Sequence, residues 1–139
     1  MNAILTMVIL MSINTPSGAL TALPTCPESP NCVSSQATDA HHIEPLAVTG
    51  EGREALEKLR RLLAERRDTT LISMGDTTLR VEFRTTLGFV DDGLFVLDLS
   101  TNLIHVRSAA RLGYWDLGKN RSRMEEIRQG FERATRISP

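Results

Sequence analysis

The chain has 139 residues, of which 41% are hydrophobic and 24% are charged, so it has the composition of one ordinary globular domain. Aromatic residues make up 4% and the net charge is −1, which argues against a base-stacking platform or a basic surface for nucleic acid. We therefore expect no nucleic acid partner.

An apolar segment opens the chain. Residues Ala3–Ile13 are apolar apart from two hydroxyl side chains, a length that suits the core of a signal peptide and is too short to span a bilayer. We predict a signal peptide at residues 1–22 and a single α+β domain at residues 23–139, located in the periplasm or cell envelope. The alternatives are a buried first strand, an uncleaved anchor that associates with a membrane, and a lipoprotein attached at Cys26.

The only two cysteines, Cys26 and Cys32, lie within the segment CPESPNC. Their spacing is too long for a Cys-x-x-C redox pair, and the chain has no further cysteine to complete a zinc site. In an oxidising compartment this short ring favours a disulfide. Two free thiols are the alternative.

Hydrophobic periodicity predicts the elements of the mature domain. The segment His41–Val48 contains Pro45, which favours an edge strand or a loop. Apolar residues at helical spacing predict a first helix at Ala55, Leu56, Leu59, Leu62 and Leu63 and a second one at Met124, Ile127, Phe131 and Ala134. Asn120 is the expected N-cap of the second helix. Apolar alternation and continuous apolar runs predict strands at Thr69–Met74, Leu79–Arg84, Phe89–Leu99 and Asn102–Tyr114.

This order of elements predicts an α+β fold with two layers. One face of the sheet is polar along its strands and needs no cover, so both helices are expected on the other face. We predict an antiparallel sheet of four to five strands with two helices on one face.

The register of the last hairpin follows from its turn. If Leu99–Asn102 forms the turn, residues whose numbers sum to 201 face each other, which pairs Phe95 with Val106 and Leu97 with Ile104 on the core side. The same register turns the carboxylate of Asp91 toward the core side, where it is expected to bond backbone groups or pair with an arginine.

On the outer face, Asp92 lies opposite Ala109, and Arg107 and Arg111 occupy the two diagonal positions, within reach of an arginine side chain. The preceding strand adds further charges to this cluster, from Arg80, Glu82 and Arg84. Two interpretations are open. Either the charges neutralise one another, or the arginines bind an anionic ligand through a carboxylate or phosphate group.

The segment GYWDLGKNR joins this hairpin to the second helix. Trp115 is expected to pack at the rim of the core, and an exposed contact for a partner is the alternative. A helix N-terminus is itself a weak anion site. We therefore add Asn120 and Arg121 to the candidate ligand-binding residues, which are Asp92, Arg107, Arg111, Asn120 and Arg121.

No residue pattern indicates catalysis. His41 and His42 are adjacent in an extended segment, so their side chains diverge and do not easily share a metal ion. Ser34 and Ser35 lack the surroundings of a known nucleophile motif, and no phosphate-binding or dinucleotide-binding glycine loop is present. We assign no catalytic residue, no metal and no cofactor.

Three segments of the chain resemble, in order and spacing, the family known as domain of unknown function 1499 (DUF1499). They are CPESPNCVSSQATDAHHIEPL, FVDDGLFVLD and IHVRSAARLGYWDLGKNRSRMEEIR. One departure is Ala110, where the family pattern Arg-Ser-x-Ser-Arg implies serine. The resemblance implies an exported or membrane-associated protein of bacteria, with relatives in plastids. It implies no reaction, cofactor or catalytic residue.

Together these observations predict a non-catalytic binding or accessory domain of the envelope. Its arginine-rich surface would take a small anionic ligand or a protein partner, and residues 101–139 do hold eight basic and four acidic side chains. The alternative is a small envelope hydrolase that uses Asp92 or a histidine as general base.

Overall fold

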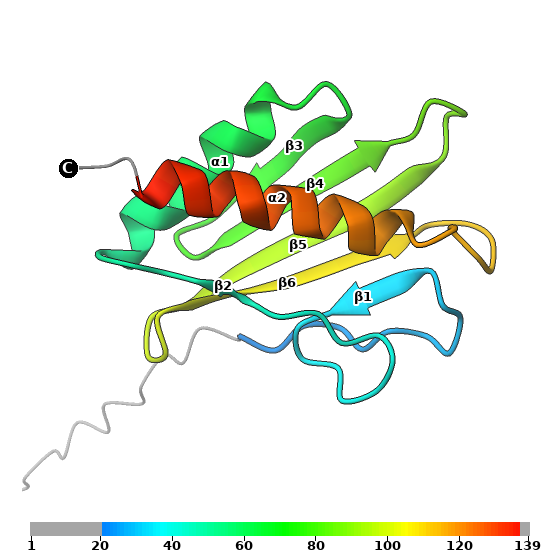
Figure 1. Cartoon of the computed structure of the whole chain (residues 1–139), viewed down its shortest axis with the longest axis horizontal. Coiled ribbons are helices and arrows are strands. Elements are labelled where there is room, and N and C mark those ends of the chain that lie inside the picture. Colours follow the sequence, from blue (N-terminus) through cyan, green and yellow to red (C-terminus); the bar gives the residue numbers. More distant parts are fainter. Residues whose placement is uncertain (1–20, 137–139) are drawn as a thin grey trace, which may run out of the picture.

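The computed structural model describes residues 21–136 and shows one antiparallel sheet covered on one face by two helices (Figure 1). The elements are β1 (Cys32–Ser34), β2 (Leu46–Ala47), α1 (Gly52–Glu65), β3 (Thr69–Met74), β4 (Thr78–Arg84), β5 (Val90–Asp98), β6 (Leu103–Ala110) and α2 (Lys119–Arg136). The strand order is β1-β6-β5-β4-β3, and β2 also pairs with β6. The α+β class and the shared helix face are confirmed, with six strands in place of four to five. Most of the predicted signal peptide lies outside the described residues.

Acidic side chains cap the start of both helices. At α1, the Glu51 carboxylate accepts a hydrogen bond from the backbone N–H of Glu54 at 2.7 Å. At α2, Asp116 takes this role, because its carboxylate accepts from the N–H groups of Gly118 and Asn120, both at 2.9 Å. The prediction that Asn120 caps α2 is therefore wrong. Neither helix, nor any other within residues 21–136, is long and apolar enough to cross a bilayer.

The predicted register of the last hairpin is confirmed. Phe95 pairs with Val106 and Leu97 with Ile104, and all four side chains are buried under the helices. The core lies between this face of the sheet and the apolar sides of α1 and α2.

Strand β1 is too short to be predicted from the sequence, and it forms because β6 offers it a partner. Cys32 pairs with Ala109 and Ser34 with Arg107. The disulfide between Cys26 and Cys32 is present and holds the segment that precedes β1 close to this edge of the sheet.

Candidate functional site

The outer face of the sheet carries the predicted charge cluster, centred on Arg111. The Arg111 guanidinium donates to Asp92 at 2.6 and 3.1 Å and to Glu82 at 2.9 Å. These hydrogen bonds, above all those to Asp92, raise the pKa of Arg111 above its ordinary value. Because two carboxylates occupy its donors, the arrangement is one of mutual neutralisation.

Arg107 lies on the same face but does not join this ion pair. Its Nη2 donates to the backbone carbonyl of Thr25 at 3.3 Å, so the segment beside the disulfide covers it. Its Nε is buried without a partner in the part of the chain that the structure describes. Burial lowers the pKa of the Arg107 guanidinium.

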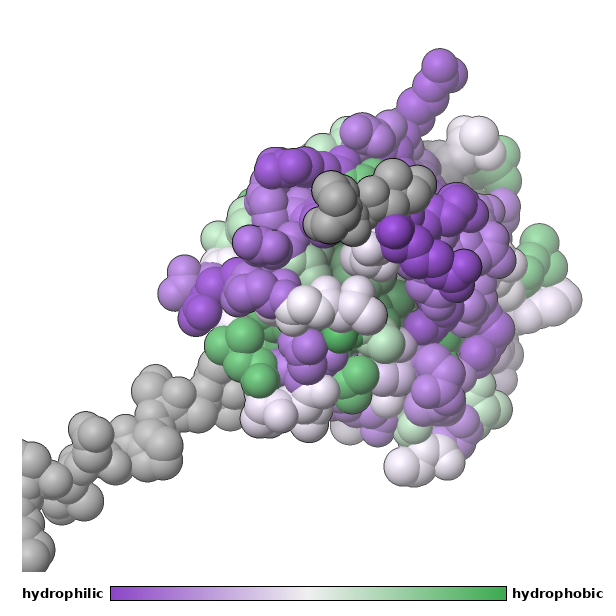
Figure 2. All heavy atoms as spheres, turned by 60° about the vertical axis from the view of Figure 1, so that its left-hand side comes forward, coloured by the Kyte–Doolittle hydropathy of each residue, from purple (hydrophilic) through white to green (hydrophobic). Residues whose placement is uncertain are grey.

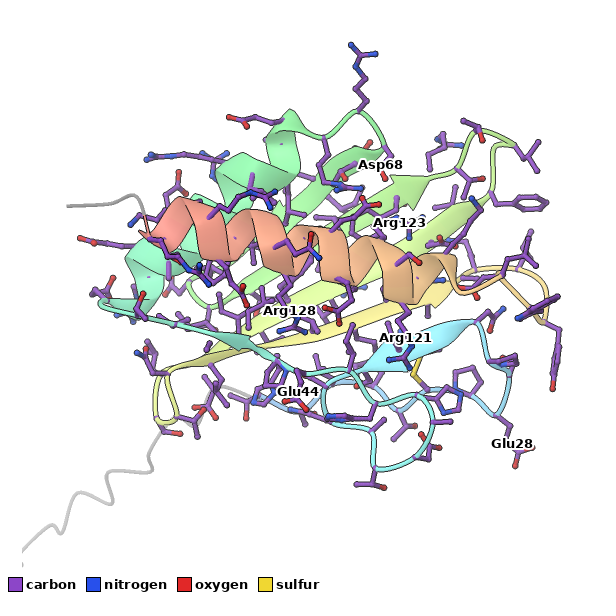
Figure 3. All side chains as sticks on the ribbon, in the orientation of Figure 1. Glu28, Glu44, Asp68, Arg121, Arg123 and Arg128 are labelled. Carbon is purple, nitrogen blue, oxygen red and sulfur yellow. A yellow bond between two sulfur atoms is a disulfide. The ribbon has the colours of Figure 1, made fainter. Side chains whose placement is uncertain are left out.

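The remaining two candidate ligand residues, Asn120 and Arg121, lie on α2, on the other side of the sheet. Figure 3 shows where Arg121 lies on α2. Its guanidinium donates to the backbone carbonyls of His42 and Ala40, both at 2.8 Å. Asn120 is 1% exposed and has no surface for a ligand. The five predicted ligand residues therefore do not form one surface.

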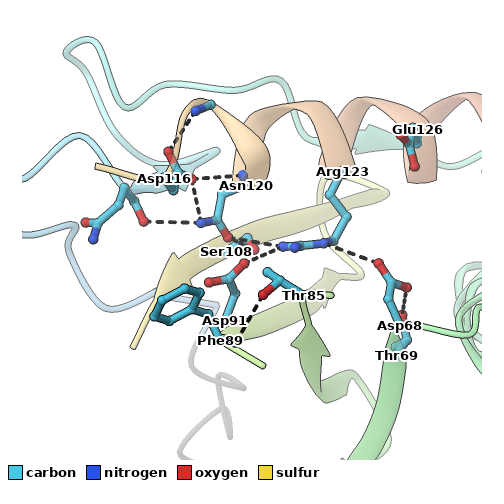
Figure 4. A network of polar contacts seen from close by, with 12 residues as sticks. Asp68, Thr69, Thr85, Phe89, Asp91, Ser108, Asp116, Asn120, Arg123 and Glu126 are labelled. Carbon is cyan, nitrogen blue, oxygen red and sulfur yellow. Dashed lines mark hydrogen bonds and ion pairs between the residues drawn. The ribbon is translucent and has the colours of Figure 1, made fainter. Parts of the chain in front are cut away.

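A buried ion pair joins α2 to the sheet. Arg123 donates from Nη1 to Oδ2 of Asp91 at 2.9 Å, and the side chains are 8% and 5% exposed (Figure 4). The guanidinium also stacks on the ring of Phe83, 4.6 Å from its centroid, and its Nε lies 3.5 Å from Asp68. The prediction that Asp91 turns toward the core side is confirmed, and of the two partners expected for it, backbone groups or an arginine, the arginine is present.

Asn120 extends this pair into a polar network (Figure 4). Its side-chain oxygen accepts from Ser108 at 2.5 Å and from Arg123 at 3.4 Å. Its amide group donates to Asp116 at 2.7 Å and to the backbone carbonyl of Asn31 at 3.4 Å. The network thus fixes the start of α2 against β6 and the loop before β1.

An apolar cleft of about 250 Å³ opens beside this network, between the β4–β5 loop and the β6–α2 loop. Asp91 and Asp116 are among the residues that line it. Its large apolar lining residues are between 55% and 83% exposed; they are Leu87, Phe89, Leu112, Trp115 and Leu117. The prediction that Trp115 packs at the rim of the core is wrong, because 69% of this residue is exposed.

Hydrogen bonds hold both walls of the cleft in place. In the β4–β5 loop, the N–H of Phe89 donates to the Thr85 hydroxyl at 3.0 Å. In the β6–α2 loop, the N–H of Arg111 donates to the carbonyl of Val90 at 3.0 Å, and the carbonyl of Gly113 accepts from Asn31 at 2.7 Å. Hydrogen bonds within the chain therefore fix the position of both loops.

A second pocket, of about 280 Å³, adjoins the cleft and shares Thr85, Thr86 and Lys119 with it. Its other lining residues are charged apart from one serine; they are Arg66, Asp68, Arg84, Ser122, Arg123 and Glu126. An apolar and a cationic compartment thus lie side by side at this end of the molecule.

The two adjacent histidines make separate contacts. The ring nitrogens of His41 lie 2.9 Å from Asp39 and 3.0 Å from the carbonyl of Ser29. Both acceptors raise the pKa of His41, and the Ser29 carbonyl has the larger effect. The ring nitrogens of His42 contact the carbonyl of Ala37 and Glu44. Among the described residues, no three His, Cys, Asp or Glu side chains gather as a metal site would require.

Comparison with known proteins places this architecture in a family. A family model described as "Protein of unknown function (DUF1499)" matches residues 22–131. The chain belongs to the DUF1499 family. No curated protein and no solved structure matches it. The DUF1499 match spans the disulfide, all six strands and both walls of the apolar cleft, so the cleft lies within the family domain and not in an added segment.

Proposed function

We propose that this protein is an exported, non-catalytic binding module of the cell envelope that takes the alkyl chain of a small amphiphile into the cleft between the β4–β5 and β6–α2 loops. The observation that carries the proposal is the concentration of large, exposed apolar side chains around one cleft. Figure 2 turns the opposite end of the molecule toward the viewer and shows mainly hydrophilic side chains there, with small, separate apolar patches.

Leu117 adds an independent argument. Its φ of 58° lies in the left-handed region, which disfavours residues with a branched apolar side chain. The side chain is largely exposed, so packing in the free protein does not compensate for this conformation. Unfavourable backbone conformations gather at ligand sites. We therefore expect a ligand in the cleft to make the apolar contacts that the Leu117 side chain lacks.

The dimensions favour a single alkyl chain. A volume of about 250 Å³ is slightly below the range of roughly 300–1,000 Å³ typical of sites for drug-sized molecules. Each methylene group that leaves water contributes about 0.8 kcal/mol, so a chain of moderate length binds through burial alone.

Export and the lack of catalysis rest on other observations. The apolar run near the N-terminus and the disulfide between Cys26 and Cys32 support an oxidising compartment outside the cytoplasm. The hydrolase alternative has less support, because Asp92 already accepts two hydrogen bonds from Arg111 and both ring nitrogens of His41 are engaged. Arg111 is likewise engaged, which weakens the case for an anion site on the outer face.

The single tryptophan of the chain, Trp115, reports on the cleft directly. Titration with n-decanol below its solubility limit is expected to shift Trp115 emission to the blue, with saturation, and to protect it from iodide quenching. Leu117→Asn, which suits the left-handed backbone, is expected to weaken decanol binding about tenfold through lost burial. Leu99→Asn is the matched control, because Leu99 is an exposed leucine in the turn at the opposite end of the sheet.

Three outcomes would overturn the proposal. Unchanged Trp115 emission at all decanol concentrations would remove the alkyl site. A shift with phosphatidylcholine vesicles but not with monomeric decanol would indicate docking on a bilayer. A shift that depends on protein concentration and not on decanol would indicate that a second copy of the chain covers the cleft.

A further inference from the structure

We infer that the amphiphile is anionic: its alkyl chain lies in the apolar cleft, and its carboxylate or phosphate head lies in the adjoining pocket, beside Arg84 and Lys119. The inference rests on the proposed function, because it assigns the head of the molecule whose tail the cleft holds. The two compartments share Thr85, Thr86 and Lys119, so one molecule can occupy both.

The charges of the pocket favour an anion. Its lining contains four cations and two carboxylates, namely Arg66, Arg84, Lys119 and Arg123 against Asp68 and Glu126. Two of the cations are already engaged, since Arg66 lies 2.9 Å from Asp68 and Arg123 lies 2.9 Å from Asp91. Glu126 also pairs with Arg66, at 3.4 Å. With Asp91 counted, the pocket keeps a small surplus of positive charge, and its two cations outside these ion pairs are Arg84 and Lys119.

Arg84 and Lys119 both line the charged pocket, and Lys119 lines the apolar cleft as well. Arg84 ends β4 and Lys119 begins α2, and both residues are exposed. Within residues 21–136, neither side chain makes an ion pair with a carboxylate. A charged pocket that contains both cations and adjoins an apolar cleft matches the head of a single-chain anionic amphiphile.

Hydroxyl groups complete the donor set. Thr85, Thr86 and Ser122 line the same pocket. The Thr85 oxygen accepts a hydrogen bond from Phe89, which leaves the hydroxyl hydrogen of Thr85 available to an anion. The N–H groups of Lys119 and Asn120 at the start of α2 already donate to the carbonyl and the carboxylate of Asp116, so the anion would be held mainly by side chains.

The test compares four C10 amphiphiles as monomers at low salt, with Trp115 fluorescence as the readout: decanol, decanoate, decyl phosphate and decyltrimethylammonium. Because exposed charge pairs are weak, the two exposed cations predict that decanoate or decyl phosphate binds about tenfold more tightly than decanol. The two anions differ only in the head, so their ratio shows whether carboxylate or phosphate is preferred. The cationic compound is expected to bind more weakly than decanol.

Variants separate the head from the tail. Arg84→Ala with Lys119→Ala is expected to abolish the preference for the anions over decanol. Each affinity is compared with that of decanol for the same variant, because Lys119 also lines the apolar cleft. Arg53→Ala, at the exposed start of α1 at the other end of the sheet, is the matched control. Equal melting temperatures would establish that the variants fold.

The inference and the proposed function fail in different ways. Decanol binding with no preference for anions, or an anion preference that persists in the double variant, would overturn the inference and leave the alkyl site standing. Failure of all four compounds to shift Trp115 would overturn both. A shift with anionic vesicles but with no monomer would overturn both in favour of a membrane surface.

Discussion

Arg123 of α2 donates from Nη1 to Oδ2 of Asp91 on β5 at 2.9 Å, and both side chains are more than nine-tenths buried. Asp91 also lines the apolar cleft, so the ion pair couples the cleft to the contact between helix and sheet. The site and the stability of this end of the molecule therefore depend on the same two side chains.

Asp91→Ala is expected to lower the free energy of unfolding by about 3–5 kcal/mol, because it leaves the Arg123 guanidinium buried without its partner. The double variant Asp91→Leu with Arg123→Met removes both charges and is expected to recover a large part of this loss. Urea unfolding of the single and double variants measures the coupling. A loss below about 1 kcal/mol in Asp91→Ala would show that water enters the site and solvates Arg123.

Leu117→Asn is expected to stabilise the free protein by about 1 kcal/mol, because asparagine adopts the left-handed conformation at lower cost than leucine. The same variant weakens decanol binding under the proposed function, so stability and binding are expected to move in opposite directions. Thermal unfolding and the fluorescence titration measure the two effects. Lower stability in Leu117→Asn would mean that the leucine side chain packs in the free protein.

Local pattern is enough to predict the layers and the register, but not the cleft. Alternation with a period of two fixes which face each residue of β5 takes, and this is why the positions of Asp91 and Asp92 are predicted correctly. The cleft forms where two loops that are separate in the sequence meet, so no local pattern shows that Trp115 and Leu87 line the same cleft. The burial of Arg123 could have been predicted, because Arg123 lies four residues before Ile127 on the same apolar face of α2.

Gly93→Ala is expected to destabilise the fold by about 1–3 kcal/mol through overpacking. An added Cβ would lie 2.5 Å from Cε2 of Phe83 and 2.6 Å from Cγ2 of Val81, both of which are buried in the core. Gly75→Ala is the matched control, because the nearest atom to its added Cβ is 4.0 Å away. Chemical denaturation of the two variants should separate them clearly, and equal midpoints would show that the sheet shifts to make room.

His41 gives the fold a dependence on pH. Its two ring nitrogens face acceptors, the carbonyl of Ser29 and the Asp39 carboxylate, so the doubly protonated ring is favoured and the pKa is raised, although Arg121 opposes this. A group whose pKa is higher in the folded state stabilises the fold fully below its unfolded pKa of about 6.5. The contribution is lost as pH rises through the folded-state pKa. Urea unfolding is measured from about pH 5.5 to about pH 8.5, a range that includes the unfolded-state pKa of histidine. The wild type should show this decline in stability, and His41→Ala should show a flatter profile. An equal slope in both proteins would assign the dependence to other groups.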